Sequence, residues 1–127
     1  MSKEFVRRIL HVDLTSGSLE VEAPSEAFYR KYLGGSAMGM YYILKEMKPG
    51  ADPLGPDNVL TMMVSVLTGA PISGQSRMCA NARSPLTDGI GDAQCGGFFP
   101  AEMRFAGFDG IVVRGRSPRP VYLWLHD

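Results

Sequence analysis

The segment from Gly96 to Gly115 constrains the fold more than any other part of the chain. It reads GGFFPAEMRFAGFDGIVVRG: a glycine pair, an amphipathic turn of helix, a break at Gly107 and an apolar strand. A glycine pair ahead of a helix lets backbone N–H groups approach a ligand closely, and the N-terminus of a helix favours an anion. The segment therefore predicts a helix–turn–strand unit that begins with a backbone suited to an anionic group.

Hydrophobic periodicity and turn residues predict the other elements. Strands are expected at residues 5–14, 19–21, 59–66, 78–82, 111–113 and 121–125, and helices at residues 25–33, 36–47 and 99–106. Ser25 is a suitable N-cap for the first helix, and Gly34 ends it. Because the helices interrupt runs of strands without a regular β-α-β alternation, the pattern favours an α+β fold. We expect a mixed or antiparallel sheet with two or three helices.

Size and charge narrow the class of protein. At 127 residues, of which 45% are hydrophobic, residues 1–127 fit a single domain with its own core. Thirteen basic and thirteen acidic residues give a formal net charge of zero, which disfavours nucleic acid or an anionic membrane as a partner and does little to oppose self-association. No signal-peptide core is present near the start, and the longest apolar run is too short to span a bilayer. We therefore expect a cytoplasmic protein.

Residue types that commonly carry catalysis or bind metal are few and scattered. Cys79 and Cys95 lack Cys-x-x-Cys spacing, so both are predicted to be buried or half-buried thiols, and no iron–sulfur cluster is expected in this chain. Glu102 and Asp109 fall in a helix and a turn without an obvious partner, which favours solvent-exposed or capping roles over acid–base catalysis. Neither a P-loop nor a Gly-x-Gly-x-x-Gly between strand and helix occurs, which argues against a nucleotide-binding fold. No catalytic residue is predicted.

Short motifs recur in a fixed order along the whole chain and carry a resemblance to a known family. They are Leu14-Thr15-Ser16-Gly17, Tyr32-Leu33-Gly34-Gly35, Asp52-Pro53-Leu54, Leu67-Thr68-Gly69, Ser84-Pro85-Leu86-Thr87, the block from Gly96 to Gly115, and Arg119-Pro120-Val121-Tyr122. In this order and at this spacing, the chain resembles the N-terminal domain of the aldehyde ferredoxin oxidoreductase family. It is much shorter than such enzymes.

The resemblance implies a cofactor and a set of residues that contact it. The family's cofactor is a tungsten (rarely molybdenum) bis-pterin with a magnesium ion between the pterin phosphates. By motif, Arg77 matches an arginine that contacts the cofactor, and Gly96 and Gly97 form the glycine pair whose backbone meets it. Gln94 stands where the family has an asparagine that helps to hold the magnesium, so it is a candidate both for cofactor binding and as a metal ligand. An arginine fork, backbone N–H groups and an amide suit phosphates and polar pterin edges.

The same resemblance implies an activity for the complete enzyme: two-electron oxidation of an aldehyde to a carboxylate, or the reverse, with ferredoxin as the electron partner. The family's cluster cysteines, its other cofactor-binding segments and its substrate channel lie in later domains. The chain alone is therefore not expected to be catalytic, nor to retain tungsten, molybdenum or an iron–sulfur cluster when isolated.

Two functions remain open at this point. The chain is either the cofactor-binding domain, or a small subunit, of an aldehyde oxidoreductase, or a stand-alone non-catalytic domain that acts in binding or assembly. The family's N-terminal domain is a duplication, and this chain covers its first unit. We therefore expect strands 59–66 and 111–113 to expose apolar surface, which favours either a homo-oligomer or association with the missing domains.

Overall fold

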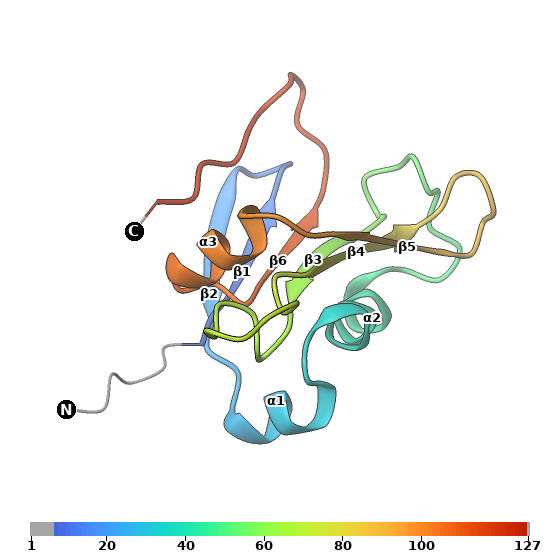
Figure 1. The fold of residues 1–127 in the computed structure, drawn as a ribbon. Coiled ribbons are helices and arrows are strands. Elements are labelled where there is room, and N and C mark those ends of the chain that lie inside the picture. Colours follow the sequence, from blue (N-terminus) through green and yellow to red (C-terminus); the bar gives the residue numbers. More distant parts are fainter. Residues whose placement is uncertain (1–6, 127) are drawn as a thin grey trace.

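The computed structural model describes residues 7–126, which form one six-stranded sheet with three helices (Figure 1). The elements in chain order are β1 (Ile9–Asp13), β2 (Ser18–Glu22), α1 (Glu26–Tyr32), α2 (Gly35–Glu46), β3 (Leu60–Val64), β4 (Met78–Arg83), β5 (Ile90–Cys95), α3 (Phe99–Phe105) and β6 (Gly110–Arg114). The prediction of an α+β fold with a mixed sheet is confirmed.

The strands lie in the order β2-β1-β6-β3-β4-β5. The final strand, β6, is inserted between β1, to which it runs parallel, and β3, to which it runs antiparallel. The other neighbours pair antiparallel, including the predicted β1–β2 hairpin around Gly17, whose φ is +74°. Strands distant in the sequence thus meet at the centre of the sheet, and the outer edges belong to β2 and β5.

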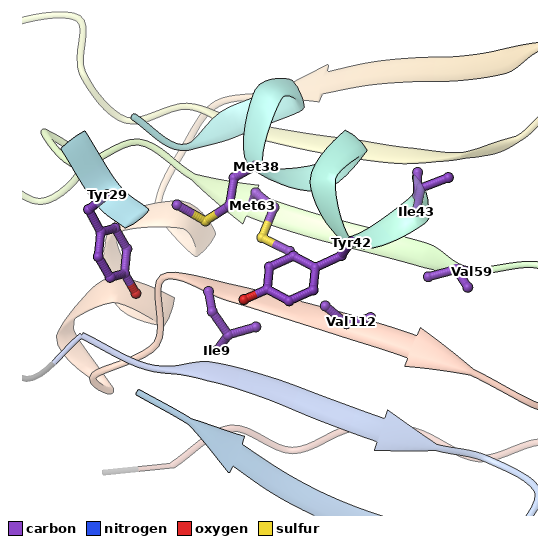
Figure 2. Packing of buried hydrophobic residues seen from close by; sticks show 8 residues of the cluster. All are labelled: Ile9, Tyr29, Met38, Tyr42, Ile43, Val59, Met63 and Val112. Carbon is purple, nitrogen blue, oxygen red and sulfur yellow. The ribbon is translucent and has the colours of Figure 1, made fainter. Parts of the chain in front are cut away.

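One face of the sheet packs against α1 and α2. Side chains alternate along each strand, so every second residue of β1, β3 and β6 points to this face. Figure 2 shows the ring of Tyr42 reaching from α2 toward Ile9 and Val112, with Met38 and Met63 beside it. These residues are almost completely buried. Ser25 caps α1, since its Oγ accepts a hydrogen bond from the N–H of Phe28 at 3.3 Å, as predicted.

The opposite face of the sheet packs against α3. The buried cluster on this side contains Leu10, Val12, Val64, Met78 and Ile111 from the strands, and Met103 from α3. Leu125, in the C-terminal segment, packs against the same cluster. The two clusters sandwich the sheet, and the helix that follows the glycine pair is thereby fixed to the sheet through Met103.

Three expectations about the elements were wrong. Residues 90–95 form strand β5, which was not expected because its sequence, IGDAQC, contains one β-branched residue and two glycine or aspartate residues. Residues 121–125 alternate in hydrophobicity but form no strand. Strands 59–66 and 111–113 were expected to expose apolar surface, yet Val59, Met63 and Ile111 are at most 2% exposed because β3 and β6 lie in the middle of the sheet; only Leu60, at the start of β3, is a large apolar side chain exposed to 40% in these described strands. Residues 5 and 6 of the first expected strand lie outside the described residues.

Within residues 7–126, no helix is long and apolar enough to cross a membrane.

Candidate functional site

The candidate site lies where β4 begins and β5 ends. The antiparallel register of these strands pairs Met78 with Cys95, and the next residues outward along the ladder are Arg77 and Gly96. A Cβ placed on Gly96 would lie 3.9 Å from both Cδ and Nε of Arg77, so the guanidinium stem passes directly over this glycine. Arg77 is exposed. The structure thus brings together two residues that are far apart in the sequence and that were both expected to contact the cofactor.

Gln94 projects from the same face of the sheet as Arg77. It pairs with Cys79 across the β4–β5 ladder, and side chains two residues apart on a strand share a face. This face is the one covered by α2, and the first turn of α2 reaches the site: a Cβ on Gly35 would lie 3.4 Å from Sγ of Cys79. The N-cap of α2, Gly34, has no side chain with which to satisfy the first N–H groups of the helix.

The glycine pair leaves its backbone open. Gly97 has a φ of +88°, a conformation that favours glycine, and nothing lies within 4 Å of the position that its Cβ would occupy. Its carbonyl accepts a hydrogen bond from Oγ of Ser76, which ties the pair to the loop before Arg77. Because α3 has only seven residues and begins behind Phe98, an anion at this place would be bound by Arg77 and the loop backbone, with little contribution from the helix.

The site offers few ligands for a metal ion. Residues 7–126 contain no group of three or more histidine, cysteine, aspartate or glutamate side chains arranged to hold one. Magnesium bound to phosphates, however, commonly takes only one or two protein oxygens and completes its octahedron with phosphate oxygens and water. The exposed amide of Gln94 meets that modest requirement. The residues present therefore suit a magnesium–phosphate group better than a bare metal ion.

The cysteines contribute differently from each other. Cys79 is half-buried, as predicted, beneath the start of α2. Cys95 is exposed, so its predicted burial was wrong: it is the last residue of β5, which lies at the edge of the sheet. The two side chains point to opposite faces of the sheet, since residue 79 pairs with 94 and residue 78 with 95.

Asp109 was expected to be exposed or to cap a helix, and this was wrong. Its side chain is 2% exposed, and Oδ1 lies 2.8 Å from Nη1 of Arg104, whose side chain is 6% exposed. Oδ2 accepts hydrogen bonds from the hydroxyl of Tyr29 and from the N–H of Arg8, both at 3.1 Å. Burial raises the pKa of Asp109 and lowers the pKa of Arg104, so each ion depends on the other. This network joins α3 to α1 and to the residue before β1, and it includes neither Arg77 nor Gln94, so we interpret it as structural.

The chain is similar to known proteins over nearly its whole length. A sequence model described as "Aldehyde ferredoxin oxidoreductase, N-terminal domain" matches residues 9–127. The chain belongs to this family. The match covers every strand and helix described above, so the family assignment rests on the whole length of the described sequence rather than on one motif.

Relatives with high sequence identity support the assignment. The tungsten-containing aldehyde ferredoxin oxidoreductases of Pyrococcus abyssi and Thermococcus kodakarensis are 42% and 43% identical over 120 residues, which is 94% of this chain and 20% of each relative. A protein of Pyrococcus furiosus described as "Aliphatic sulfonate oxidoreductase, WOR-like subunit" is 32% identical over 123 residues, 94% of this chain and 19% of that protein.

A solved structure has the same fold. The active site complex BamBC of benzoyl coenzyme A reductase, in complex with 1,5-dienoyl-CoA, superposes with a TM-score of 0.89 at 35% identity, over 93% of this chain and 18% of that one. The chain therefore spans about a fifth of the length of the relatives it matches. These relatives carry different substrates in their descriptions, although they share this unit.

Proposed function

We propose that this chain is a single cofactor-binding domain, or small subunit, of an aldehyde:ferredoxin oxidoreductase-type enzyme. In this proposal it binds the phosphate end of a tungsten or molybdenum bis-pterin cofactor. The observation that carries the proposal is the position of Arg77 over Gly96, beside the open backbone of Gly97. A guanidinium next to glycine-rich backbone is a typical arrangement for binding phosphate.

Different residues of the chain would contact different parts of the cofactor. Arg77 would pair with phosphate oxygens, and the backbone of Gly96 and Gly97 would approach the same group without steric hindrance from a Cβ. Gln94 would offer its amide oxygen to the bridging magnesium. When bound, the cofactor supplies two-electron oxidation of an aldehyde to a carboxylate, with electrons passed on to ferredoxin. The domain itself binds and orients.

The choice of substrate is not part of this proposed role. Relatives described by aldehydes, by aliphatic sulfonate and by benzoyl coenzyme A share this unit with the present chain. A unit shared by proteins with such different described substrates suits a role other than substrate selection, and cofactor binding is such a role. The residues that select an aldehyde, and the cysteines for the iron–sulfur cluster, are proposed to lie in further domains or in a second subunit.

A second candidate function, assembly, is favoured by the apolar surface around α3. Leu19 and Val21 on β2 are 61% and 54% exposed, and Phe105 on α3 is 62% exposed. A groove of about 470 Å³ lies between α3 and the C-terminal segment, with Trp124 at its wall. This surface suits either the remaining domains of the enzyme or a second copy of the chain. Light scattering of the purified chain at micromolar concentration tests self-association, and a monodisperse monomer would exclude the second copy.

The test of cofactor binding uses magnesium pyrophosphate as the probe for the phosphate end. The ¹⁵N-labelled 127-residue chain is titrated with the probe while amide shifts are followed by NMR. We expect the shifts of Arg77, Gly96 and Gly97 to move together. Arg77→Ala should weaken binding by about 10- to 150-fold, since a hydrogen bond to a charged group contributes about 1.5–3 kcal/mol.

Arg119→Ala is the matched control, because Arg119 is also an exposed arginine in a loop but lies outside the site. This substitution should leave the affinity for the probe within about twofold of that of the unmodified chain. An equal loss of affinity in both variants would show that the binding is nonspecific attraction between the anion and the protein surface. An absence of shifts at Arg77, Gly96 and Gly97 in the unmodified chain would refute the proposed site.

A further inference from the structure

The loop that carries Arg77 connects β3 to β4 and has no regular secondary structure. It runs from residue 65 to residue 77, contains Gly69 and Gly74 with φ of +86° and +76°, and is exposed over much of its length. Long irregular loops of this composition are usually mobile. A mobile loop would place Arg77 in many positions and would weaken any site that depends on it.

Thr68 ties the two ends of this loop together. It is 3% exposed, although its neighbour Leu67 is 54% exposed. Its Oγ1 accepts a hydrogen bond from the N–H of Ser65 at 3.1 Å, at the entry to the loop. The same oxygen lies 3.4 Å from the carbonyl oxygen of Gln75 and 3.3 Å from that of Arg77, at the exit. Because a hydroxyl carries one proton, it donates to these two carbonyls as a shared bond.

Two further bonds fix the exit of the loop. Oε1 of Gln75 accepts from the N–H of Gly69 at 2.6 Å, which closes the loop on itself. Ser76 donates its hydroxyl proton to the carbonyl of Gly97, across the gap between the two segments of the site. The backbone of Arg77 is therefore held from within the loop by Thr68, and the neighbouring residue is held from the glycine pair by Ser76.

We propose that Thr68 and Ser76 are positioning residues, whose hydroxyls hold Arg77 in place over Gly96 and beside Gly97. The inference rests on the proposed function, because positioning matters only if Arg77 binds the anionic end of a cofactor. It goes beyond that function by assigning a role to two residues that need not touch the ligand. Neither Thr68 nor Ser76 belongs to either of the two core clusters.

The first arm of the test needs no ligand. Backbone order parameters of Arg77, Gly96 and Gly97 are measured by ¹⁵N relaxation in the unmodified chain and in Thr68→Val, Thr68→Ser and Ser76→Ala. We expect values near 0.85, typical of rigid backbone, in the unmodified chain and in Thr68→Ser, and values below about 0.6 in Thr68→Val. Ser76→Ala should lower the values at Gly97 most. If Thr68→Val does not fold, Ser76→Ala alone decides, because Ser76 lies at the surface.

Thr61→Val is the matched control. Thr61 is also a buried threonine whose hydroxyl donates to a carbonyl, that of Asn81 at 3.4 Å, but it lies in the sheet beneath α2. It should leave the order parameters at the site unchanged, although it removes an equivalent hydrogen bond. Unchanged order at Arg77 and Gly97 in Thr68→Val and Ser76→Ala would overturn the inference. So would an equal loss of order in Thr61→Val.

The second arm repeats the titration with magnesium pyrophosphate. We expect at least a tenfold loss of affinity in Thr68→Val, recovery to within about twofold in Thr68→Ser, and no loss in Thr61→Val. Loss of order in the first arm together with unchanged affinity would also overturn the inference, since Arg77 would then bind without being positioned. Failure of the unmodified chain to bind the probe would refute the proposed function, whereas the first arm would still decide whether the hydroxyls fix the loop.

Discussion

Replacing Asp109 by asparagine should destabilise the fold more than any conservative change at the surface. The substitution keeps the shape of the side chain but removes its charge. Tyr29 and Arg8 can still donate to one oxygen, whereas Arg104 then faces an amide instead of a carboxylate. Arg104 loses the carboxylate that lies 2.8 Å from its Nη1, while its side chain stays only 6% exposed.

The expected magnitude follows from this burial. Breaking a buried ion pair by removing one partner costs about 3–5 kcal/mol, because the remaining charge has lost its compensation. Burial is also the main cause of both pKa shifts in the pair, upward for Asp109 and downward for Arg104. A domain of this size is stable by about 5–15 kcal/mol, so Asp109→Asn should remove a large part of the total. The double variant with Arg104→Met should recover at least about 1 kcal/mol relative to the sum of the single changes.

Urea unfolding followed by circular dichroism measures these differences. The control is Glu26→Gln, which breaks the ion pair between Glu26 and Arg30 on α1, where both side chains are more than three-quarters exposed. An exposed i,i+4 pair contributes about 0.3–0.5 kcal/mol, so this control should have little effect. If Asp109→Asn costs less than about 1 kcal/mol, or if the two single effects in the buried pair simply add, then the pair does not compensate buried charge as argued.

Three further predictions concern packing and pH. Gly39→Ala should destabilise the fold by about 1–3 kcal/mol in urea unfolding, despite the better helix propensity of alanine, because its Cβ would lie 2.6 Å from Oγ1 of the buried Thr61 on β3. Gly89→Ala is the control and should not destabilise the fold, because its Cβ would have room. Hydrogen bonds from the backbone hold the pKa of Asp13 below its usual value, so its contribution to stability should be present above about pH 4 and lost as pH falls further, and Asp13→Asn should flatten that part of the pH profile. Burial raises the pKa of Tyr29 and Tyr42 well above 10, so two of the five tyrosines should show no tyrosinate absorbance at about pH 11 until the chain unfolds. For the same reason the free energy of unfolding should fall as pH rises above 10. Titration of all five tyrosines together in the folded protein would contradict this.

Most elements could be predicted from the sequence because their signals are local. The N-cap Ser25, the glycine that breaks the chain at residue 107 and the apolar period of α2 each act within a few residues. Strand β5 could not be predicted in this way. Its residues become a strand because β4 offers a hydrogen-bonding edge, and a partner on another part of the chain leaves no mark in a window of six residues. Residues 121–125 are the opposite case, since an alternating pattern without a ladder partner does not make a strand.

The Asp109–Arg104 pair was missed for a related reason. The two residues lie five positions apart, on either side of the turn between α3 and β6, and sequence alone does not show that both are buried. A signal for this burial was present in the apolar run Ile111–Val113 of the following strand, β6. An apolar run at the centre of a sheet favours burial of the residue just before it, and a buried aspartate requires a cation nearby.

The candidate site depends on the same strand that the sequence did not reveal. Arg77 and Gln94 share a face because Met78 pairs with Cys95, and a shift of one residue in this register would turn the two side chains to opposite faces of the sheet. Met78 is 7% exposed in the cluster beneath α3, so shifting β4 would move it out of the core. Hydrophobic packing of β4 on one face of the sheet thus fixes the face on which Arg77 lies. The motif alone pointed to Arg77, Gln94 and Gly96, but their juxtaposition is a property of the ladder between β4 and β5.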